Sequence, residues 1–156
     1  MKRVYIDASV CNVLLFGEEK EAERFSHVVQ LFKVINSGEI KAVVSLYTLQ
    51  EICTYCQGNF PQETAAEVSR LAVRDLLNNE VELVPLLTRM ERLVHGRRFS
   101  IRDSTDESHV ITAHLRNCEA IIAYDEHFRD TSHIIPYLHP EELLDQWRQD
   151  TEARLR

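Results

Sequence analysis

Four acidic residues lie directly after apolar runs typical of short strands, or in the first turns of predicted helices. They are Asp7, Glu51, Asp106 and Asp125. Carboxylates that meet at one place repel one another unless a cation lies among them, and oxygen ligands suit Mg²⁺ or Mn²⁺ better than Zn²⁺. A cation held in this way can activate water and neutralise phosphate oxygens, which is the chemistry of phosphodiester cleavage.

Each acid alone also has a structural explanation. Asp7 and Asp106 fit helix caps. Glu51 fits an exposed helix residue, and Asp125 fits the start of a turn. Their convergence favours a metal site, because ligands of parallel sheets bind beyond the carboxyl ends of the strands. We expect Asp7 and Asp106 to bind metal directly, since Mg²⁺ keeps several waters, and Glu51 and Asp125 to position metal-bound water or hold a second ion.

The elements that must position these acids follow from hydrophobic periodicity. Apolar and β-branched runs predict strands at residues 2–6, 40–45, 81–84 and 119–123, with a short fifth strand at 134–135. Apolar spacings of three and four, with the stop signals between them, predict helices over residues 8–15, 20–36, 46–57, 62–78, 86–95, 105–117 and 140–149. This alternation predicts a single α/β domain with a parallel sheet of four to five strands and helices on both faces. We expect that domain to span residues 1–150, with a frayed tail at 151–156.

Composition narrows the class of protein. The chain has 156 residues and a net charge of −7, from 18 Lys and Arg against 25 Asp and Glu. A negative balance argues against a non-specific nucleic-acid coat protein, but not against an enzyme that acts on nucleic acid through metal ions. No apolar run approaches the roughly 18 residues of a membrane span, and the first residues do not form a signal peptide. We therefore expect a cytoplasmic protein with no membrane partner.

The four cysteines are too few for a disulfide scaffold and suit a reducing compartment. Cys53 and Cys56 have the spacing of a zinc or redox pair. They lie in an apolar-periodic helix with no second Cys or His pair nearby, so we interpret them as core residues.

The sequence resembles the PIN-domain ribonucleases, which include the VapC-type toxins of toxin–antitoxin pairs, in four stretches that follow in the same order. These are a strand with its first acid at 4–9, a strand, Ser and then Glu at 43–52, an Asp that opens a helix at 106–113, and a closing strand with Asp-x-x-Phe at 121–128. The resemblance implies a PIN-like fold and an Mg²⁺- or Mn²⁺-dependent endoribonuclease. By this analogy the acidic quartet is the catalytic and metal-binding set, and RNA is the substrate.

The same resemblance implies a small antitoxin that lays a helix or an extended tail across the acidic site. The hydrophobic helices at residues 20–36 and 62–78 fit a groove for such a partner, a homodimer face, or plain core. These alternatives stay open at this point.

Two positions depart from the family pattern. Tyr124 stands where the family more often has a small hydroxyl residue, so a contact to metal-bound water or phosphate is missing there. Asp103 is an extra acid one helical turn before Asp106, and we interpret it as a helix cap. His109 lies three residues after Asp106 and can approach the site, although a lone His on a helix is more often a structural residue.

Substrate contacts are predicted from charge and from hydroxyl groups. Residues 89–102 carry five arginines against one glutamate, so Arg97, Arg98 and Arg102 can pair with RNA phosphates and Phe99 can stack on a base. A solvated helix end is the competing explanation. Hydroxyl contacts near the site are expected from Ser9 and Ser45, for which a turn or cap function is equally consistent.

Two other classes of protein stay open. One is a PIN-like binding or scaffold module that binds metal weakly or not at all. The other is a flavodoxin-like or other phosphate-handling α/β protein, which the absence of a Gly-rich phosphate loop makes less consistent with the sequence. The intact set of four acids favours the enzyme.

Overall fold

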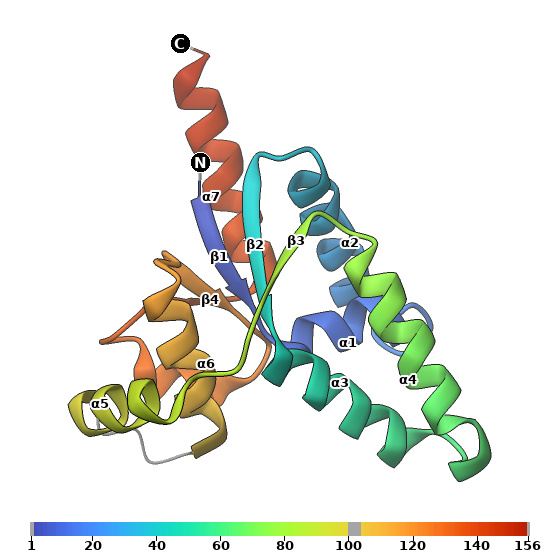
Figure 1. The fold of residues 1–156 in the computed structure, drawn as a ribbon. Coiled ribbons are helices and arrows are strands. Elements are labelled where there is room, and N and C mark those ends of the chain that lie inside the picture. Colours follow the sequence, from blue (N-terminus) through green and yellow to red (C-terminus); the bar gives the residue numbers. More distant parts are fainter. Residues whose placement is uncertain (1, 100–103, 156) are drawn as a thin grey trace.

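A computed structural model describes residues 2–99 and 104–155. Its five strands form one parallel sheet in the order β3-β2-β1-β4-β5 (Figure 1). The strands are β1 (Lys2–Ile6), β2 (Ile40–Ser45), β3 (Val81–Val84), β4 (Ala120–Ile122) and β5 (Tyr137–Leu138). The predicted parallel α/β sheet is confirmed, and β1 lies at its centre.

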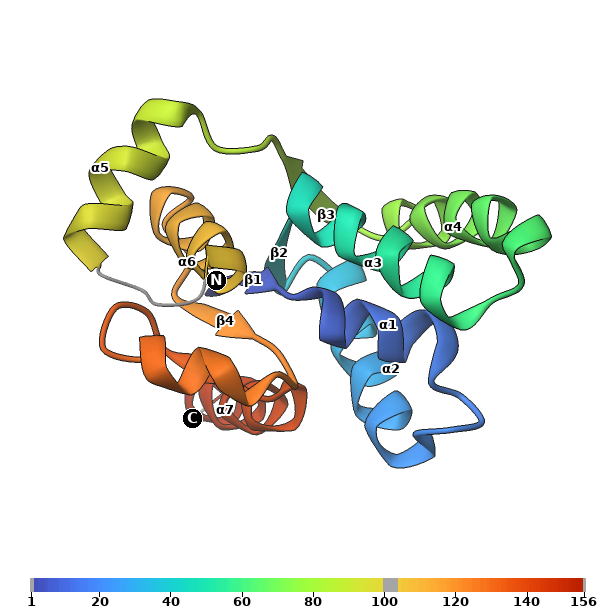
Figure 2. The ribbon, with the colours of Figure 1, turned by 90° about the horizontal axis from the view of Figure 1, so that it is seen from below.

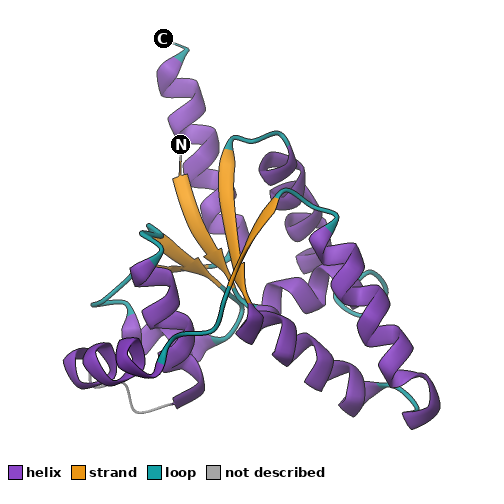
Figure 3. Ribbon diagram, in the orientation of Figure 1, coloured by secondary structure: helices purple, strands orange, loops and turns teal. Residues whose placement is uncertain are grey.

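Helices cover both faces of the sheet (Figure 3). One face packs against α1 (Ala8–Phe16), α2 (Ala22–Asn36), α3 (Leu46–Asn59), α4 (Gln62–Leu77) and α7 (Pro140–Arg154). The other packs against α5 (Arg89–Phe99), α6 (Ser104–Leu115) and the 3-10 helix η1 (Glu126–Thr131). Successive strand residues point to opposite faces, so Val4 and Ile6 enter the first core while Tyr5 enters the second. All three are fully buried.

The fifth strand is not where the sequence predicted it. Residues 134–135 belong to the turn after η1, because the N–H groups of Ile134 and Ile135 bond the carbonyl of Thr131. Pairing begins one residue later, where the Pro136 carbonyl accepts from Ile121, and the strand is Tyr137–Leu138. The β-branched pair therefore fills the second core instead of forming a strand.

The helix boundaries differ from the predicted ones by at most two residues, except in α5 and α7, where the differences are larger. Helix α5 begins at Arg89, not at 86, because Thr88 caps it: the Thr88 N–H donates to Glu91 Oε2 at 2.7 Å and the Glu91 N–H donates to Thr88 Oγ1 at 3.1 Å. Helix α7 continues to Arg154, beyond the predicted end at 149. An ion pair between Lys2 Nζ and Asp150 Oδ2 (3.1 Å) joins its last turns to β1.

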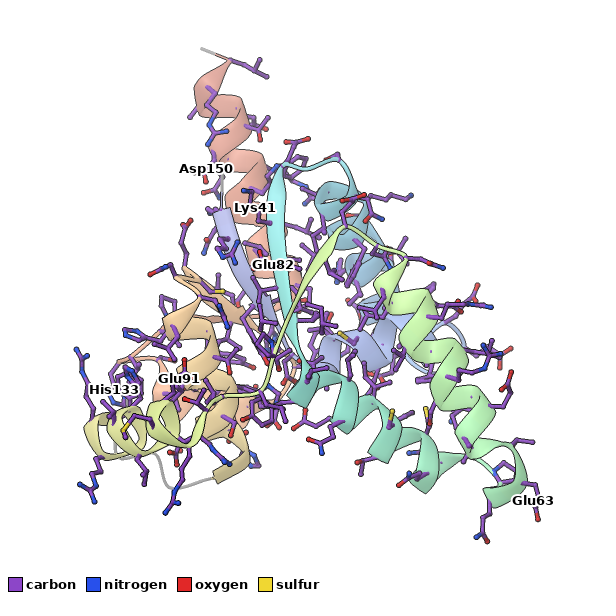
Figure 4. The ribbon with its side chains drawn as sticks, in the orientation of Figure 1. Lys41, Glu63, Glu82, Glu91, His133 and Asp150 are labelled. Carbon is purple, nitrogen blue, oxygen red and sulfur yellow. The ribbon has the colours of Figure 1, made fainter. Side chains whose placement is uncertain are left out.

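The surface acids are spread over the molecule. Figure 4 shows Glu63, Glu82, Glu91 and Asp150 at widely separated places on α4, β3, α5 and α7. The negative net charge is thus not confined to one edge of the sheet. None of the helices in the described part of the chain is long and apolar enough to cross a membrane.

Candidate functional site

Asp7 follows β1 and caps the N-terminus of α1. Its Oδ2 accepts hydrogen bonds from the Ser9 N–H (2.8 Å) and the Ser9 hydroxyl (2.6 Å). The Ser9 oxygen in turn accepts from the Tyr124 N–H at 2.9 Å, which fixes it between two strand ends. Burial raises the pKa of Asp7 and the Glu51 charge adds to this, while His109 and the Ser9 bonds oppose it. The effect of burial exceeds that of these contacts, so the net shift of the Asp7 pKa is upward.

His109 lies at the centre of the site and is almost fully buried, at 1% exposure. Its Nε2 lies 3.0 Å from Glu51 Oε1, and its Nδ1 lies 3.9 Å from Asp7 Oδ1. Burial lowers the pKa of His109, but the Glu51 hydrogen bond and the charges of Asp7, Glu51 and Asp106 outweigh it, so the net shift is upward. From the sequence, His109 is more consistent with a structural residue, although able to approach the site; in the structure it lies between Asp7 and Glu51, whose charges raise its pKa.

Tyr5 supports this histidine from inside the sheet. Its hydroxyl lies 2.7 Å from His109 Nδ1, 2.6 Å from Ser45 Oγ and 3.2 Å from Thr48 Oγ1. Ser45 also caps α3 through a capping box with Thr48. Ser45 is fully buried, so its hydroxyl offers no surface to a substrate, and the predicted substrate contact is replaced by a cap.

Asp7, Glu51 and His109 form the tight group of potential ligands among the described residues, and we call them the acid–histidine group. Their ligand atoms all lie within 4.8 Å of one another. Two carboxylates and an imidazole at this spacing fit a divalent cation, whose charge would offset the repulsion between the acids. Figure 2 shows α1, α3 and α6, which carry or follow these residues, gathered around the ends of β1 and β2.

Asp106 and Asp125 lie near the same edge but are not members of that group. Asp106 is buried (8% exposed) in the first turn of α6, and its charge contributes to the raised pKa of His109. Asp125 follows β4 and caps η1, where its Oδ1 accepts from the His127 N–H at 3.0 Å. The structure thus brings two of the four predicted acids into close contact and places the other two on neighbouring elements.

The side chain of Tyr124 turns toward α2 and α7. The Arg24 guanidinium lies 4.6 Å from the centroid of the Tyr124 ring, and the Tyr124 hydroxyl donates to Glu141 Oε2 at 3.3 Å. Only its backbone N–H, through Ser9, supports the site. The hydroxyl that the family pattern leads one to expect at this position is therefore not supplied by Tyr124.

The predicted arginine surface begins on α5. Arg97 and Arg98 are exposed, while Arg102 and Asp103 lie outside the described residues. The Phe99 ring is half-buried and packs edge-to-face against His114 of α6, with centroids 5.1 Å apart. Helix α5 comes close to α6 at Gly96, where an added Cβ would collide with the Glu107 carboxylate.

Among the described residues, neither Cys53 nor Cys56 belongs to a cluster of potential metal ligands. Both thiols are free, and Cys56 is buried in the first core. The interpretation as a core residue is confirmed for Cys56, whereas Cys53 is only partly buried.

Comparison with known proteins identifies the family. The family model described as PIN domain matches residues 4–134. The VapC20 toxin of Mycobacterium tuberculosis, described as cleaving the sarcin-ricin loop, superposes with a TM-score of 0.60 at 13% identity, covering 82% of this chain and 94% of that chain. DNA-bound VapBC from Salmonella typhimurium superposes with a TM-score of 0.59 at 16% identity, covering 90% of this chain and 99% of that chain. VapBC-1 from nontypeable Haemophilus influenzae superposes with a TM-score of 0.57 at 13% identity, covering 89% of this chain and 98% of that chain.

The search of curated proteins gave no match. The family model nevertheless covers most of the sequence, including Asp7, Glu51, His109 and Asp125. The chain therefore belongs to the PIN domain family.

Proposed function

We propose that this chain is an Mg²⁺- or Mn²⁺-dependent endoribonuclease and the toxin of a toxin–antitoxin pair in the cytoplasm. The observation that carries the proposal is the acid–histidine group, in which Asp7 and Glu51 converge at the carboxyl edge of the sheet. Membership of the PIN domain family supports it, as does the likeness in fold to VapC20.

Asp7 and Asp106 are proposed to hold the cation directly, and Glu51 and Asp125 to position its water or hold a second ion. The bound cation would supply an activated water and neutralise phosphate oxygens. The protein's own residues prepare the site: Ser9 orients the Asp7 carboxylate, and His109 holds Glu51. Because these side chains are fixed by hydrogen bonds before substrate arrives, little reorganisation is needed.

RNA phosphates are proposed to meet Arg97, Arg98 and Arg102. Arginine suits this task because its guanidinium binds phosphate in a bidentate manner. The similar structures from Salmonella typhimurium and Haemophilus influenzae are of VapBC rather than VapC alone, which supports a search for an antitoxin partner. A homodimer is a further proposal, to be tested by the mass of the protein in solution.

The test is cleavage of a labelled single-stranded RNA with Mn²⁺ or with EDTA, by wild type and by Asp7→Asn. Asp75→Asn is the matched control, because Asp75 is exposed on α4 and pairs with Arg74. We expect cleavage that needs both metal and Asp7, together with a rise in melting temperature on adding Mn²⁺ to wild type.

Other outcomes contradict parts of the proposal. A thermal shift without cleavage would mean that the metal site exists but RNA of this kind is not the substrate. If Mn²⁺ causes no thermal shift and the RNA is not cleaved, the PIN-like binding module is favoured over the enzyme. Equal loss in Asp75→Asn would mean that the effect is not specific to the site.

A further inference from the structure

A pocket of about 300 Å³ lies between α3 and the start of α6. We call it the α3–α6 pocket, and its walls are Tyr47, Gln50, Glu51, Thr54, Ser108 and His109. The four residues from α3 follow one another at spacings of three, one and three, so they form a single stripe on that helix. The volume is at the lower end for small-molecule sites, which fits one nucleoside and not a duplex.

The pocket adjoins the acid–histidine group. Glu51 and His109 belong to both, so a ligand in the pocket lies directly beside the proposed metal centre. If the scissile phosphate lies at that centre, the pocket is where a neighbouring nucleoside of the same strand would be. This step rests on the proposed function.

The chemistry of the walls suits a base and a ribose. Tyr47 is held in place because its hydroxyl accepts the Leu87 N–H at 3.1 Å and its ring contacts that of His109, with centroids 6.0 Å apart. A fixed aromatic ring is a platform on which an unpaired base can stack. Gln50 is exposed and carries both a donor and an acceptor, which can read the edge of a base.

The hydroxyls of Thr54 and Ser108 complete the polar rim. Thr54 Oγ1 already donates to the Gln50 carbonyl at 3.0 Å, which leaves its lone pairs to accept from a ribose hydroxyl. Among the described residues, the walls of this pocket carry the acidic Glu51 and neither Lys nor Arg, a lining that favours a neutral nucleoside over a phosphate. Phosphate and nucleoside would thus be bound by different parts of the site.

From these features we infer that the α3–α6 pocket binds the nucleoside next to the scissile phosphate, with its base stacked on Tyr47 and read by Gln50. Because a base inside a duplex cannot enter such a pocket, the substrate must present an unpaired nucleotide at this position. The enzyme would then prefer one base there.

The first test is independent of cleavage. The wild-type protein in Mg²⁺ is titrated with each of the four nucleoside 5′-monophosphates, which an endonuclease cannot cut, and the Gln50 side-chain amide is followed by ¹⁵N NMR. Nucleosides without phosphate and inorganic phosphate alone separate base binding from phosphate binding. We expect shifts at Gln50 with at least one nucleoside, with or without its phosphate, and none with inorganic phosphate.

Variants then test the two wall residues. Gln50→Ala should weaken the preference for that base by on the order of tenfold. Tyr47→Leu should weaken nucleoside binding, whereas Tyr47→Phe should keep the stacking surface and most of the binding. Gln57→Ala, an exposed residue two turns further along α3, is the matched control and should change neither.

Each negative result has a distinct meaning. If none of the nucleosides shifts the Gln50 signal, the inference is overturned. The alternative occupant of the pocket would then be a side chain of a partner protein. Shifts at Gln50 without RNA cleavage by wild type would support the pocket while contradicting the proposed nuclease. Cleavage with a base preference that Gln50→Ala and Tyr47→Leu both leave unchanged overturns the inference alone.

Discussion

The hydroxyl oxygen of Tyr5 lies 2.7 Å from Nδ1 of His109 and so connects the central strand to α6. The other nitrogen of the same ring lies 3.0 Å from Glu51. The orientation of a glutamate on α3 therefore depends on a tyrosine in the middle of the sheet.

Tyr5→Phe removes the hydroxyl that Ser45, Thr48 and His109 share. Buried polar groups that lose a partner cost roughly 1–3 kcal/mol, so we expect a clear fall in the free energy of unfolding. The Mn²⁺-induced thermal shift should also fall, because Glu51 loses its support. Denaturant unfolding measures the first effect, and Tyr55→Phe is the control. Unchanged stability and an unchanged shift would contradict the proposed network.

Asp7→Asn should leave the metal-free protein as stable as wild type, or slightly more stable. The pKa of Asp7 is raised by burial and by Glu51, so at neutral pH its ionised form costs stability in the folded state. Asparagine keeps an acceptor for the Ser9 N–H without the charge. Thermal unfolding in EDTA measures the difference. A large loss of stability would instead mean that the Asp7 charge stabilises the fold, through His109 and the N-terminus of α1.

Ser9→Ala should lower both stability and metal affinity. The Ser9 hydroxyl donates to Asp7 and accepts from the Tyr124 N–H, so its loss leaves that backbone group without its acceptor. We expect a cost of roughly 1–3 kcal/mol and a weaker Mn²⁺ thermal shift. Calorimetry with and without Mn²⁺ measures the stability and the thermal shift, and Ser132→Ala, at an exposed serine, is the control. A change in stability alone would separate the serine from the metal site.

Thiol reactivity should distinguish the cysteines. Cys11, Cys56 and Cys118 are buried, and burial raises the pKa of each, to about 11 for Cys118. We expect one fast thiol near pH 8 with Ellman's reagent, that of Cys53, and loss of this phase in Cys53→Ser. Two or more fast thiols would contradict the packing.

The shift at Cys118 also has a consequence for stability at high pH. Its ordinary pKa is 9.0, so above that value the unfolded chain releases a proton that the folded chain keeps until about pH 11. Stability should therefore fall as the pH rises from 9 toward 11. Melting temperatures of wild type and Cys118→Ala across this range measure the difference, and parallel curves would contradict it.

Helix α7 should be held by its apolar residues and not by its ion pair. Leu144 is 2% exposed in the first core, so Leu144→Ala should cost about 2–5 kcal/mol. Asp150 pairs with Lys2 at a half-exposed position, so Asp150→Asn should cost about 1 kcal/mol or less. Urea unfolding measures the loss of stability in both variants. A larger loss in Asp150→Asn than in Leu144→Ala would mean that the ion pair holds the helix.

The positions of Asp7 and Asp125 could be predicted from the sequence because they depend on local order alone. An apolar strand followed at once by an acid places that acid at the carboxyl edge of a parallel sheet, whatever the rest of the chain does. The parallel sheet followed in the same way from alternating strands and helices.

The position of His109 between its partners could not be predicted because those partners are distant in the chain. Tyr5 and Glu51 lie 104 and 58 residues away from it. The one local signal was a histidine three residues after an acid, which is common on helices. Ser45 shows the opposite case, since its place after a strand fitted both a site and a cap, and only the depth of burial decides between them.

The acid–histidine group draws on both helical layers: Glu51 lies on α3 on one face of the sheet, and His109 lies on α6 on the other. A nascent chain still on the ribosome cannot assemble this group until the α6 segment, which ends at Leu115, has been made and has emerged. Premature termination before that point would yield a product without the complete group. For the proposed nuclease, translation itself would therefore delay the onset of toxicity until most of the protein exists.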